Sequence, residues 1–495
     1  MKRLTLIILV LAFVASLGFA QNVDDALRYS RTYYGGSARF MSMGGAFTAL
    51  GGDLSSLGQN PAGIGVFRSS EISLSPQLFH INTSSSFNGN SDDFLYNFNL
   101  NQAGFVGNII KNDNESGLIT LNFGYSFNRT HNFNQTITIR GNSSNSSLAD
   151  LWADQAEGLF KDELEDNAAE AFLAYNTWII DTLSGYDNSY ETVFSNYGDN
   201  FPSIYGQTLR RLITYEGSTK DHSLSIGGNY SNKLFFGATL GISRINFSEH
   251  YEHLETSNVA LVSGFENFNY TLHYENTGTG YSLKLGTIIK PVEQLRIGLA
   301  FHSPTFYRMS ANLYDNITAK FTNESPYEDS NSPMRYNYAL STPFRALAGV
   351  GLQIKKIGIL SVDYEYVNYA TAKFSETGDN YDYSEKNSAI KSTLAAAHNI
   401  RVGGEVRLSK LYLRGGYGYY GEAYKPGDLN EKQNLRSVSF GAGFREQNVY
   451  IDFGFTNLSN SNNYLIYDSS AGSAISNMSV NKNIYTVTLG YKFGY

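Results

Sequence analysis

The sequence predicts an all-β protein, an antiparallel transmembrane β-barrel of about fourteen strands with an N-terminal segment inside its lumen. Two observations carry this prediction. After Glu71 most of the 495-residue chain alternates between apolar and polar side chains, in runs long enough to cross a bilayer, which takes about 9–11 residues of strand. Residues 21–68 lack this alternation and are rich in Gly and small residues.

A secretory signal peptide is expected over residues 1–20. Lys2 and Arg3 precede an apolar run from Leu4 to Leu17, and small residues end at Ala20. A transmembrane helix is the competing interpretation, but the apolar run is shorter than the roughly 18 residues that such a helix needs. The mature protein is therefore expected to be exported.

The composition excludes several kinds of partner and site. The chain has no Cys, so neither disulfides nor thiolate metal sites are available. Its formal net charge of −8 argues against a nucleic-acid partner. The 47 Gly, 37 Tyr and 32 Phe, with a mean hydropathy of −0.29, are typical of a sheet whose two faces meet opposite environments. A large soluble β-sandwich would alternate as well, but it would not need strands this long.

The barrel is expected to occupy residues 69–495. Its clearest strand is the last, in which Tyr485, Val487 and Leu489 share one face with the other odd-numbered residues. The strand candidates lie near residues 72–81, 94–110, 117–139, 221–231, 234–252, 268–290, 294–321, 336–355, 358–377, 396–409, 411–424, 435–446, 449–458 and 480–494. Short turns alternate with longer polar connections, which predicts periplasmic turns, external loops and both termini on the periplasmic side.

One connection is far longer than the others. Residues 141–219 begin with a Ser- and Asn-rich run and then show helical spacing, with Ser147 and Asp150 as a capping box. We expect a helical external insertion that serves as a cap or docking platform. A solvated insertion of no specific role is the alternative.

The N-terminal segment is expected to be a hatch. A barrel of about fourteen strands falls between those filled by their own side chains and those with an open channel, so its lumen needs a plug. Residues 21–68 are the one part that precedes the wall and lacks its pattern. The residues expected to shape and gate this hatch are Gly44, Gly45, Asp53, Asn60, Pro61 and Ala62.

The hatch and several wall motifs resemble one family. Gly44-Gly45-Ala46, Ala49, Asp53 and Asn60-Pro61-Ala62 are similar to the hatch motif of the FadL/TodX family of outer-membrane transporters for long-chain fatty acids and other hydrophobic compounds. Further matches are Thr342-Pro343-Phe344, Gly349-Val350-Gly351, residues 399–405, residues 413–417 and residues 441–444. The resemblance covers nearly the whole mature chain.

This resemblance implies a passive transporter in the outer membrane of a Gram-negative bacterium. A hydrophobic ligand would be captured outside, bound at the hatch and released sideways through a gap in the wall. Outer-membrane lipids and the barrel-assembly machinery are the other expected partners, and no cofactor or catalytic residue is expected. The candidate pocket residues are Phe40, Met41, Met43, Phe47, Leu50, Val66 and Phe67, which could equally be hatch packing against the wall.

Arginines on the predicted lumen face suggest a second element of recognition. Arg401, Arg407 and Arg414 could bind a carboxylate head group bidentately. Glu405 and Asp452 are expected on the same face, so a ladder of internal ion pairs is the competing use. At the level of function, the alternative is a plugged surface receptor or adhesin. An enzyme is disfavoured because no diagnostic nucleophile motif is present.

Overall fold

The computed structural model describes residues 22–112, 116–143, 145–195, 203–261, 263–378 and 381–494. The predicted signal peptide, residues 1–20, lies outside the described residues. No helix within these ranges is both long and apolar enough to cross a membrane.

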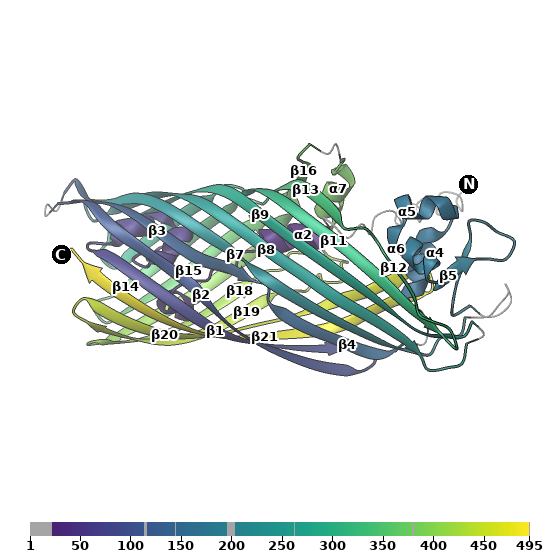
Figure 1. Cartoon of the computed structure of the whole chain (residues 1–495). Coiled ribbons are helices and arrows are strands. Elements are labelled where there is room, and N and C mark those ends of the chain that lie inside the picture. Colours follow the sequence, from purple (N-terminus) through teal and green to yellow (C-terminus); the bar gives the residue numbers. More distant parts are fainter. Residues whose placement is uncertain are drawn as a thin grey trace.

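The wall is a closed antiparallel barrel of fourteen strands, as predicted (Figure 1). Ladder pairing between β1 and β21 joins the first strand to the last. Eleven strands carry single labels: β1 (Ser70–Ser86), β2 (Asn90–Lys111), β3 (Leu118–Asn132), β7 (Gln207–Tyr230), β8 (Leu234–Ser257), β9 (Phe265–Val292), β17 (Ala396–Leu408), β18 (Leu411–Tyr420), β19 (Leu435–Glu446), β20 (Val449–Ser469) and β21 (Gly472–Phe493). Each predicted strand coincides with one of these or with an interrupted strand.

Three wall strands are interrupted, each in its middle. They are β10 (Leu295–His302) with β11 (Phe306–Phe321), β14 (Arg345–Ile354) with β13 (Met334–Ser341), and β15 (Gly358–Asn368) with β16 (Lys373–Glu376). Pro304 and Pro343 lie in two of the breaks, where a residue without an N–H cannot extend the ladder. Across them, the Thr305 N–H donates to Thr342 Oγ1 at 2.9 Å. The strand β4 (Gln135–Ser143) continues β3, and β12 (Tyr327–Ser330) is an extra short strand on β11.

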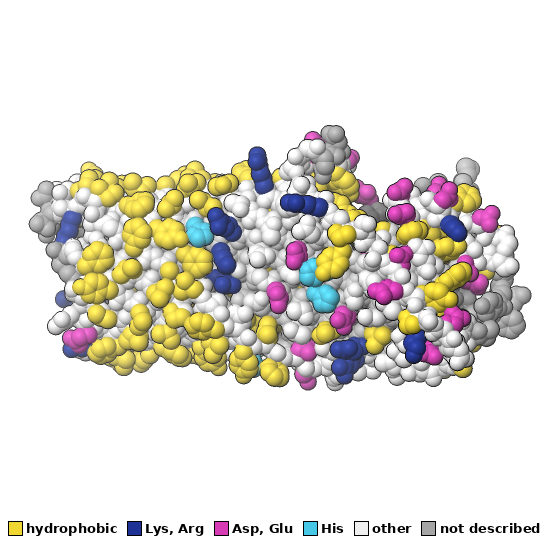
Figure 2. Space-filling view, viewed as in Figure 1, with side chains coloured by type: hydrophobic (Ala, Val, Ile, Leu, Met, Phe, Trp, Pro, Cys, Tyr) yellow, Lys and Arg dark blue, Asp and Glu magenta, His cyan; other side chains and the backbone are white. Residues whose placement is uncertain are grey.

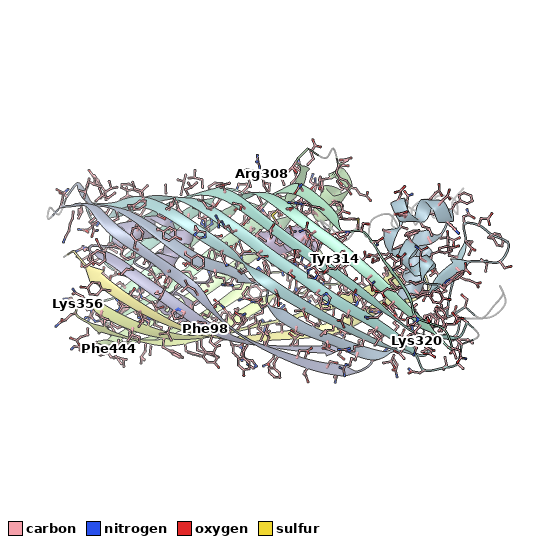
Figure 3. All side chains as sticks on the ribbon, in the orientation of Figure 1. Phe98, Arg308, Tyr314, Lys320, Lys356 and Phe444 are labelled. Carbon is pink, nitrogen blue, oxygen red and sulfur yellow. The ribbon has the colours of Figure 1, made fainter. Side chains whose placement is uncertain are left out.

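Apolar side chains form a band around one part of the wall. Outward residues such as Leu285, Leu299 and Val350 are about half exposed, whereas their neighbours on each strand face the lumen. Figure 2 shows this band on the left, on the side where Figure 3 labels Lys356, in the turn between β14 and β15. We call that side the turn end and the opposite side the loop end. Such a band is the surface that a membrane barrel presents to lipid.

At the loop end the strands continue well beyond the band. β9 has 28 residues, and β7 and β8 have 24 each. The sequence interpretation began the β7 strand at residue 221, but the strand begins at Gln207, so the insertion ends before it. Polar residues such as Arg210 and Glu216 interrupt the apolar pattern there, because this half of the strand does not face lipid.

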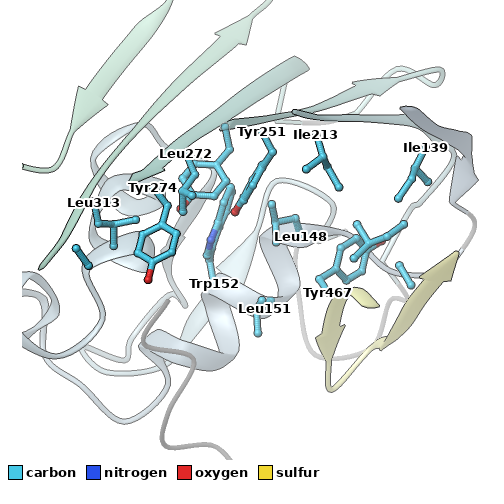
Figure 4. Packing of buried hydrophobic residues seen from close by; sticks show 14 of the residues in the cluster. Ile139, Leu148, Leu151, Trp152, Ile213, Tyr251, Leu272, Tyr274, Leu313 and Tyr467 are labelled. Atoms are coloured by element: carbon cyan, nitrogen blue, oxygen red, sulfur yellow. The ribbon is translucent and has the colours of Figure 1, made fainter. Parts of the chain in front are cut away.

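The insertion packs onto the loop end of the barrel. Its elements are α4 (Leu148–Ala156), η3 (Lys161–Glu163), α5 (Leu164–Asn167), α6 (Ala169–Asn176), β5 (Ile180–Thr182) and β6 (Tyr190–Thr192). Ser147 and Asp150 form the predicted capping box. Trp152 is fully buried against Phe268 and Tyr270 of β9. Figure 4 shows Trp152 among other members of the same cluster, such as Leu148 and Tyr251. Two smaller helical elements, η4 (Tyr369–Thr371) and α7 (Ser384–Thr393), lie between β15 and β17 in the chain.

Residues 22–69 enter the barrel before the wall begins. They form α2 (Val23–Ser30), α3 (Ala38–Ser42) and the short helices η1 (Leu54–Gly58) and η2 (Pro61–Val66), drawn in purple inside the strands in Figure 1. α3 contacts β18 to β21, while η2 contacts β3 and β7 to β9, so this N-terminal segment spans the lumen from wall to wall.

Candidate ligand cavity and the N-terminal segment

Glycines and short polar side chains give the N-terminal segment its shape. Gly44 and Gly45 have φ values of +63° and +71°, in the left-handed region that only Gly adopts without strain. Asp53 caps η1, because its carboxylate accepts from the Ser55 N–H at 2.9 Å and from Ser37 Oγ at 2.7 Å. Asn60 caps η2 through the Ala62 N–H, and Pro61 begins that helix.

Polar bonds hold the segment to the wall. Asp363 of β15 accepts from both the backbone N–H and the hydroxyl of Thr48, at 2.8 and 2.7 Å. Asn60 Nδ2 donates to the Thr48 carbonyl at 2.6 Å and to the Thr287 carbonyl of β9 at 3.2 Å. From the wall, Lys284 Nζ donates to the Gly58 carbonyl at 3.0 Å. Each of these groups could bond to water instead.

Wall glycines make room for the segment. A Cβ added at Gly286 of β9 would lie 1.9 Å from Asn60 Oδ1, and one at Gly298 of β10 would lie 2.0 Å from the Thr48 carbonyl oxygen. Any side chain at either position would therefore displace the segment. The sequence interpretation quoted other wall glycines as family motifs, and their contacts show a common reason: a Cβ at Gly403 or Gly416 would also overlap the segment.

The predicted pocket residues lie mostly in packed clusters. Phe40, Met43, Phe47 and Leu50 bury against one another, with Met41 at their edge. Val66 packs on a cluster with Ala62, Phe235 and Ile288, and Phe67 packs with Leu54, Leu57, Ile64 and Val106. Of the seven, only Met41 lines the large cavity described below. Of the other six, Val66 and Phe67 pack against wall residues, whereas Phe40, Met43, Phe47 and Leu50 pack against one another.

Two of the predicted arginines are buried in ion pairs. Arg401 donates from Nη1 to Glu365 at 2.8 Å and lies over the Tyr34 ring. Arg414 bridges Glu405 and Asp452, both at 2.6 Å, and Glu405 also accepts from Arg39 of the N-terminal segment. Arg407 is instead exposed beside the turn at Ser409.

A cavity of about 610 Å³ lies on the loop side of the N-terminal segment. This volume is in the range of small-molecule sites. Apolar side chains line one side of it: Leu27, Phe79, Ile81, Met478, Val480 and Ile484. Tyr34, Met41, Gly44 and Gly45 bring the N-terminal segment into the lining. Burial and the Glu365 charge raise the pKa of Tyr34 well above its usual value, so the phenol stays neutral.

Lys482 contributes a cation to this cavity that the sequence interpretation missed. It lies on the inward face of β21, opposite Ile81 of β1. Among the described residues it forms no ion pair, in contrast to Arg401 and Arg414. Its position among inward-facing apolar residues of the last strand was the available signal.

The wall has a gap beside the cavity. β2 and β3 pair from Lys111↔Thr120 only as far as Gln102↔Asn128. Beyond that point β2 pairs with β1 alone, while the end of β3 and all of β4 pair with β7 alone. Nearer the loop end, the Thr138 N–H of β4 donates to the Asp93 carboxylate of β2 at 2.6 Å and so links the two sides again. We call the unpaired stretch between these two links the window.

The N-terminal segment touches both edges of the window. The Tyr33 N–H donates to the Thr130 carbonyl of β3 at 3.0 Å, and Asn101 of β2 donates to the Gly36 carbonyl at 2.6 Å. Asn101 and residues 129–133 also line the cavity. Buried polar atoms of Asn99, Asn128, His131 and Asn132 have no hydrogen-bond partner among the described residues. The window is thus a polar, unpaired part of the wall closed by the segment.

Comparisons with known proteins were informative only at the level of structure. No family model matches the sequence, and no curated protein matches it either. This chain is similar to the crystal structure of a Pseudomonas aeruginosa FadL homologue, with a TM-score of 0.55 and 12% sequence identity. The match covers 94% of this chain and 99% of the homologue. The chain has the fold of the FadL-like barrels.

Two further structures share this FadL-like fold. The Pseudomonas putida toluene transporter TodX covers 93% of this chain and 99% of its own, at a TM-score of 0.53 and 12% identity. The match to the CymD monoaromatic hydrocarbon channel covers 93% of this chain and 98% of that channel, with a TM-score of 0.50 and 11% sequence identity.

Proposed function

We propose that the protein is a passive transporter of hydrophobic molecules in the outer membrane of a Gram-negative bacterium, with both termini on the periplasmic side. One observation carries this proposal: a single cavity is lined both by the N-terminal segment and by the window in the wall. A ligand in that cavity has one route blocked by a polar plug and a second route that leads sideways into the membrane.

The lining suggests an amphipathic ligand. The inward faces of β1 and β21 supply Phe79, Ile81, Val480 and Ile484, and Lys482 supplies a charge with no carboxylate partner among the described side chains. A long-chain fatty acid fits this pattern, with its tail on the apolar wall and its carboxylate at Lys482. The proteins with the same fold include a toluene transporter and a monoaromatic hydrocarbon channel, and this supports a hydrophobic compound as the ligand.

Lateral release follows from the energetics of the ligand. Each buried methylene gains about 0.8 kcal/mol on leaving water, so a long chain prefers the bilayer core to an aqueous lumen. The window lies between strands β2 and β3, and β2 carries Phe94, Tyr96 and Phe98 exposed on its outer face. We infer that movement of residues 33–36 away from Thr130 and Asn101 opens this route.

In this proposal the N-terminal segment, residues 21–68, acts as the hatch. Asn60 and Asp53 fix its two short helices, and Gly44 and Gly45 form the turn that meets the cavity. No catalytic residue or cofactor takes part. The seven predicted pocket residues then support the hatch, with Met41 as the member that meets the ligand.

Blocking the cavity tests the proposal. Val480→Trp should fill the apolar side of the cavity and abolish uptake of a labelled fatty acid, because the ligand loses its binding space. Val438→Trp, on the outer face of β19, adds the same ring outside the barrel and should leave uptake unchanged. Both variants should remain heat-modifiable on gels. Normal uptake by Val480→Trp would contradict transport through this cavity and favour a plugged receptor.

A further inference from the structure

A row of cations crosses the outer face of the barrel. Arg129 of β3 pairs directly with Lys220 of β7, and Lys220 pairs with Arg244 of β8. Arg244 pairs with Thr279 of β9, which in turn pairs with Arg308 of β11. One register line across five neighbouring strands therefore carries four cations, and all four lie on the outward face of their strands. We call Arg129, Lys220, Arg244 and Arg308 the basic row.

The basic row lies at the loop-side edge of the apolar band. The next outward residues toward the turn end are apolar or aromatic on each of the five strands: Phe127, His222, Ile242, Tyr281 and Phe306. Figure 2 shows dark-blue side chains gathered along this edge of the yellow band, and Figure 3 shows Arg308 pointing away from the barrel. In a membrane, this height is that of the lipid head groups.

The row is costly unless an anion occupies it. Like charges directly opposite each other on neighbouring strands are destabilising. Among the described side chains, none of the four cations forms an ion pair with a carboxylate. The nearest outward carboxylates on these strands, Glu216 and Glu275, lie four residues from the row along β7 and β9, or about 13 Å at the usual rise per residue.

We propose that the basic row binds the anionic phosphate head groups of lipids in the leaflet at the loop end of the barrel. Phosphates spaced along a leaflet edge can sit between neighbouring cations and accept from both, which removes the cross-strand repulsion. The row starts at Arg129, on the edge of the window, so bound lipids would surround the proposed exit. Lys220, Arg244 and Arg308 lie outside the cavity, whereas Arg129 also lines it at the window. Lipid binding by the row does not depend on the transported ligand.

Lipid retention tests the proposal directly. The purified protein is exchanged into phosphocholine micelles with a mixture of phosphatidylglycerol and phosphatidylcholine, and bound lipids are counted by native mass spectrometry. The wild type should retain phosphatidylglycerol preferentially. The combined variant R129Q/K220Q/R244Q/R308Q should lose this preference by at least about tenfold, since each cation near an anionic surface contributes several-fold.

A matched control removes the same charge elsewhere. K161Q/K320Q/K391Q/K432Q changes four exposed lysines beyond the band and should keep the lipid preference. Thermal unfolding provides a second readout. In phosphocholine micelles without anionic lipid, the row variant should be at least as stable as the wild type, because the repulsion is gone, and phosphatidylglycerol should stabilise only the wild type and the control.

Three results would overturn the proposal. The row variant could keep the wild-type preference for phosphatidylglycerol. It could be less stable than the wild type in neutral micelles, which would make the cations structural. Decanoate could displace the bound phosphatidylglycerol at equal concentration, which would assign the row to the carboxylate of an exiting ligand.

Discussion

Two parts of the molecule are held to the barrel in different ways. The N-terminal segment has small apolar clusters on the wall, such as that of Val66 with Phe235 and Ile288, and hydrogen bonds to Asp363, Thr287 and Lys284, with glycines facing it. The insertion at the loop end is held by Trp152 in a continuous cluster of aromatic and aliphatic side chains (Figure 4). Water can replace the hydrogen bonds of the segment, whereas exposure of the insertion's cluster costs about 25 cal/mol per Å² of apolar surface.

From this difference we infer which part of the molecule moves and which part stays fixed. A plug that must leave its place cheaply is best held by groups that water can satisfy. A cap that must keep its place is best held by buried apolar area. We therefore expect the N-terminal segment to move during transport and the insertion to stay docked, and each of the following changes tests one side of this contrast.

The largest effect is expected at Trp152. Trp152→Ala removes a fully buried ring and should weaken docking of the insertion by roughly 3–5 kcal/mol, the usual cost of such a truncation. Hydrogen exchange of residues 148–176 measures this loss. Trp178→Ala is the control, because Trp178 is half exposed in the same insertion and should cost far less. Equal exchange in the two variants would show that apolar packing does not hold the cap.

A smaller effect is expected at Asn60. Asn60→Ala removes the cap of η2 and the bonds to Thr48 and Thr287, for roughly 1–3 kcal/mol of local stability. Exchange of the N-terminal segment should rise while the wall stays protected. Combined with Pro61→Ala, the change should lower uptake of a labelled fatty acid in a barrel that remains heat-modifiable.

Asn481→Ala serves as the control for the Asn60 variant, since Asn481 faces outward on β21. If Asn60→Ala with Pro61→Ala transports at the wild-type rate, these two residues have no part in gating.

The smallest effect is a dependence of cap docking on pH. Burial raises the pKa of Asp150 to about 7, and burial with the Asp315 charge raises that of Glu170 to about 8. Because both folded-state values are raised, docking is most stable below the usual carboxyl pKa of about 4 and weakens as pH rises from there to about 7 to 8, above which this contribution is lost. The fluorescence of Trp152, in a Trp178→Phe background, reports this change. Glu170→Gln should remove the part of the pH dependence that extends to about pH 8. An unchanged pH profile in this variant would refute the role of Glu170.

The sequence predicted the wall well because alternation is a local signal. Each of the fourteen strands has an outward apolar face that can be recognised from a few neighbouring residues, as Tyr485 and Leu489 show for β21. The outer half of β7 was missed because both of its faces carry polar residues. The breaks in β10–β11 and β13–β14 had a signal in Pro304 and Pro343, whose meaning depends on pairing between strands far apart in the chain.

The cavity could be predicted only in part. The Gly- and Asn-rich motif located the N-terminal segment, but its predicted pocket residues pack against one another or against the wall, and of the seven only Met41 lines the cavity. The lining combines the N-terminal segment with strands such as β1, β3, β20 and β21, which meet only after the barrel closes. Lys482 had a local signal in its position among inward-facing apolar residues of β21, whereas the window had none, because it depends on which strands pair and where pairing stops.

Locking the N-terminal segment to the wall tests the central claim most directly. A Cβ at Gly351 of β14 would lie 3.6 Å from the Ala49 Cβ, within the range of disulfides, and the chain has no other Cys. We predict that Ala49→Cys with Gly351→Cys stops fatty-acid uptake when oxidised and regains it on reduction, while each single variant transports in both states. Uptake at the wild-type rate by the oxidised double variant would contradict a moving hatch.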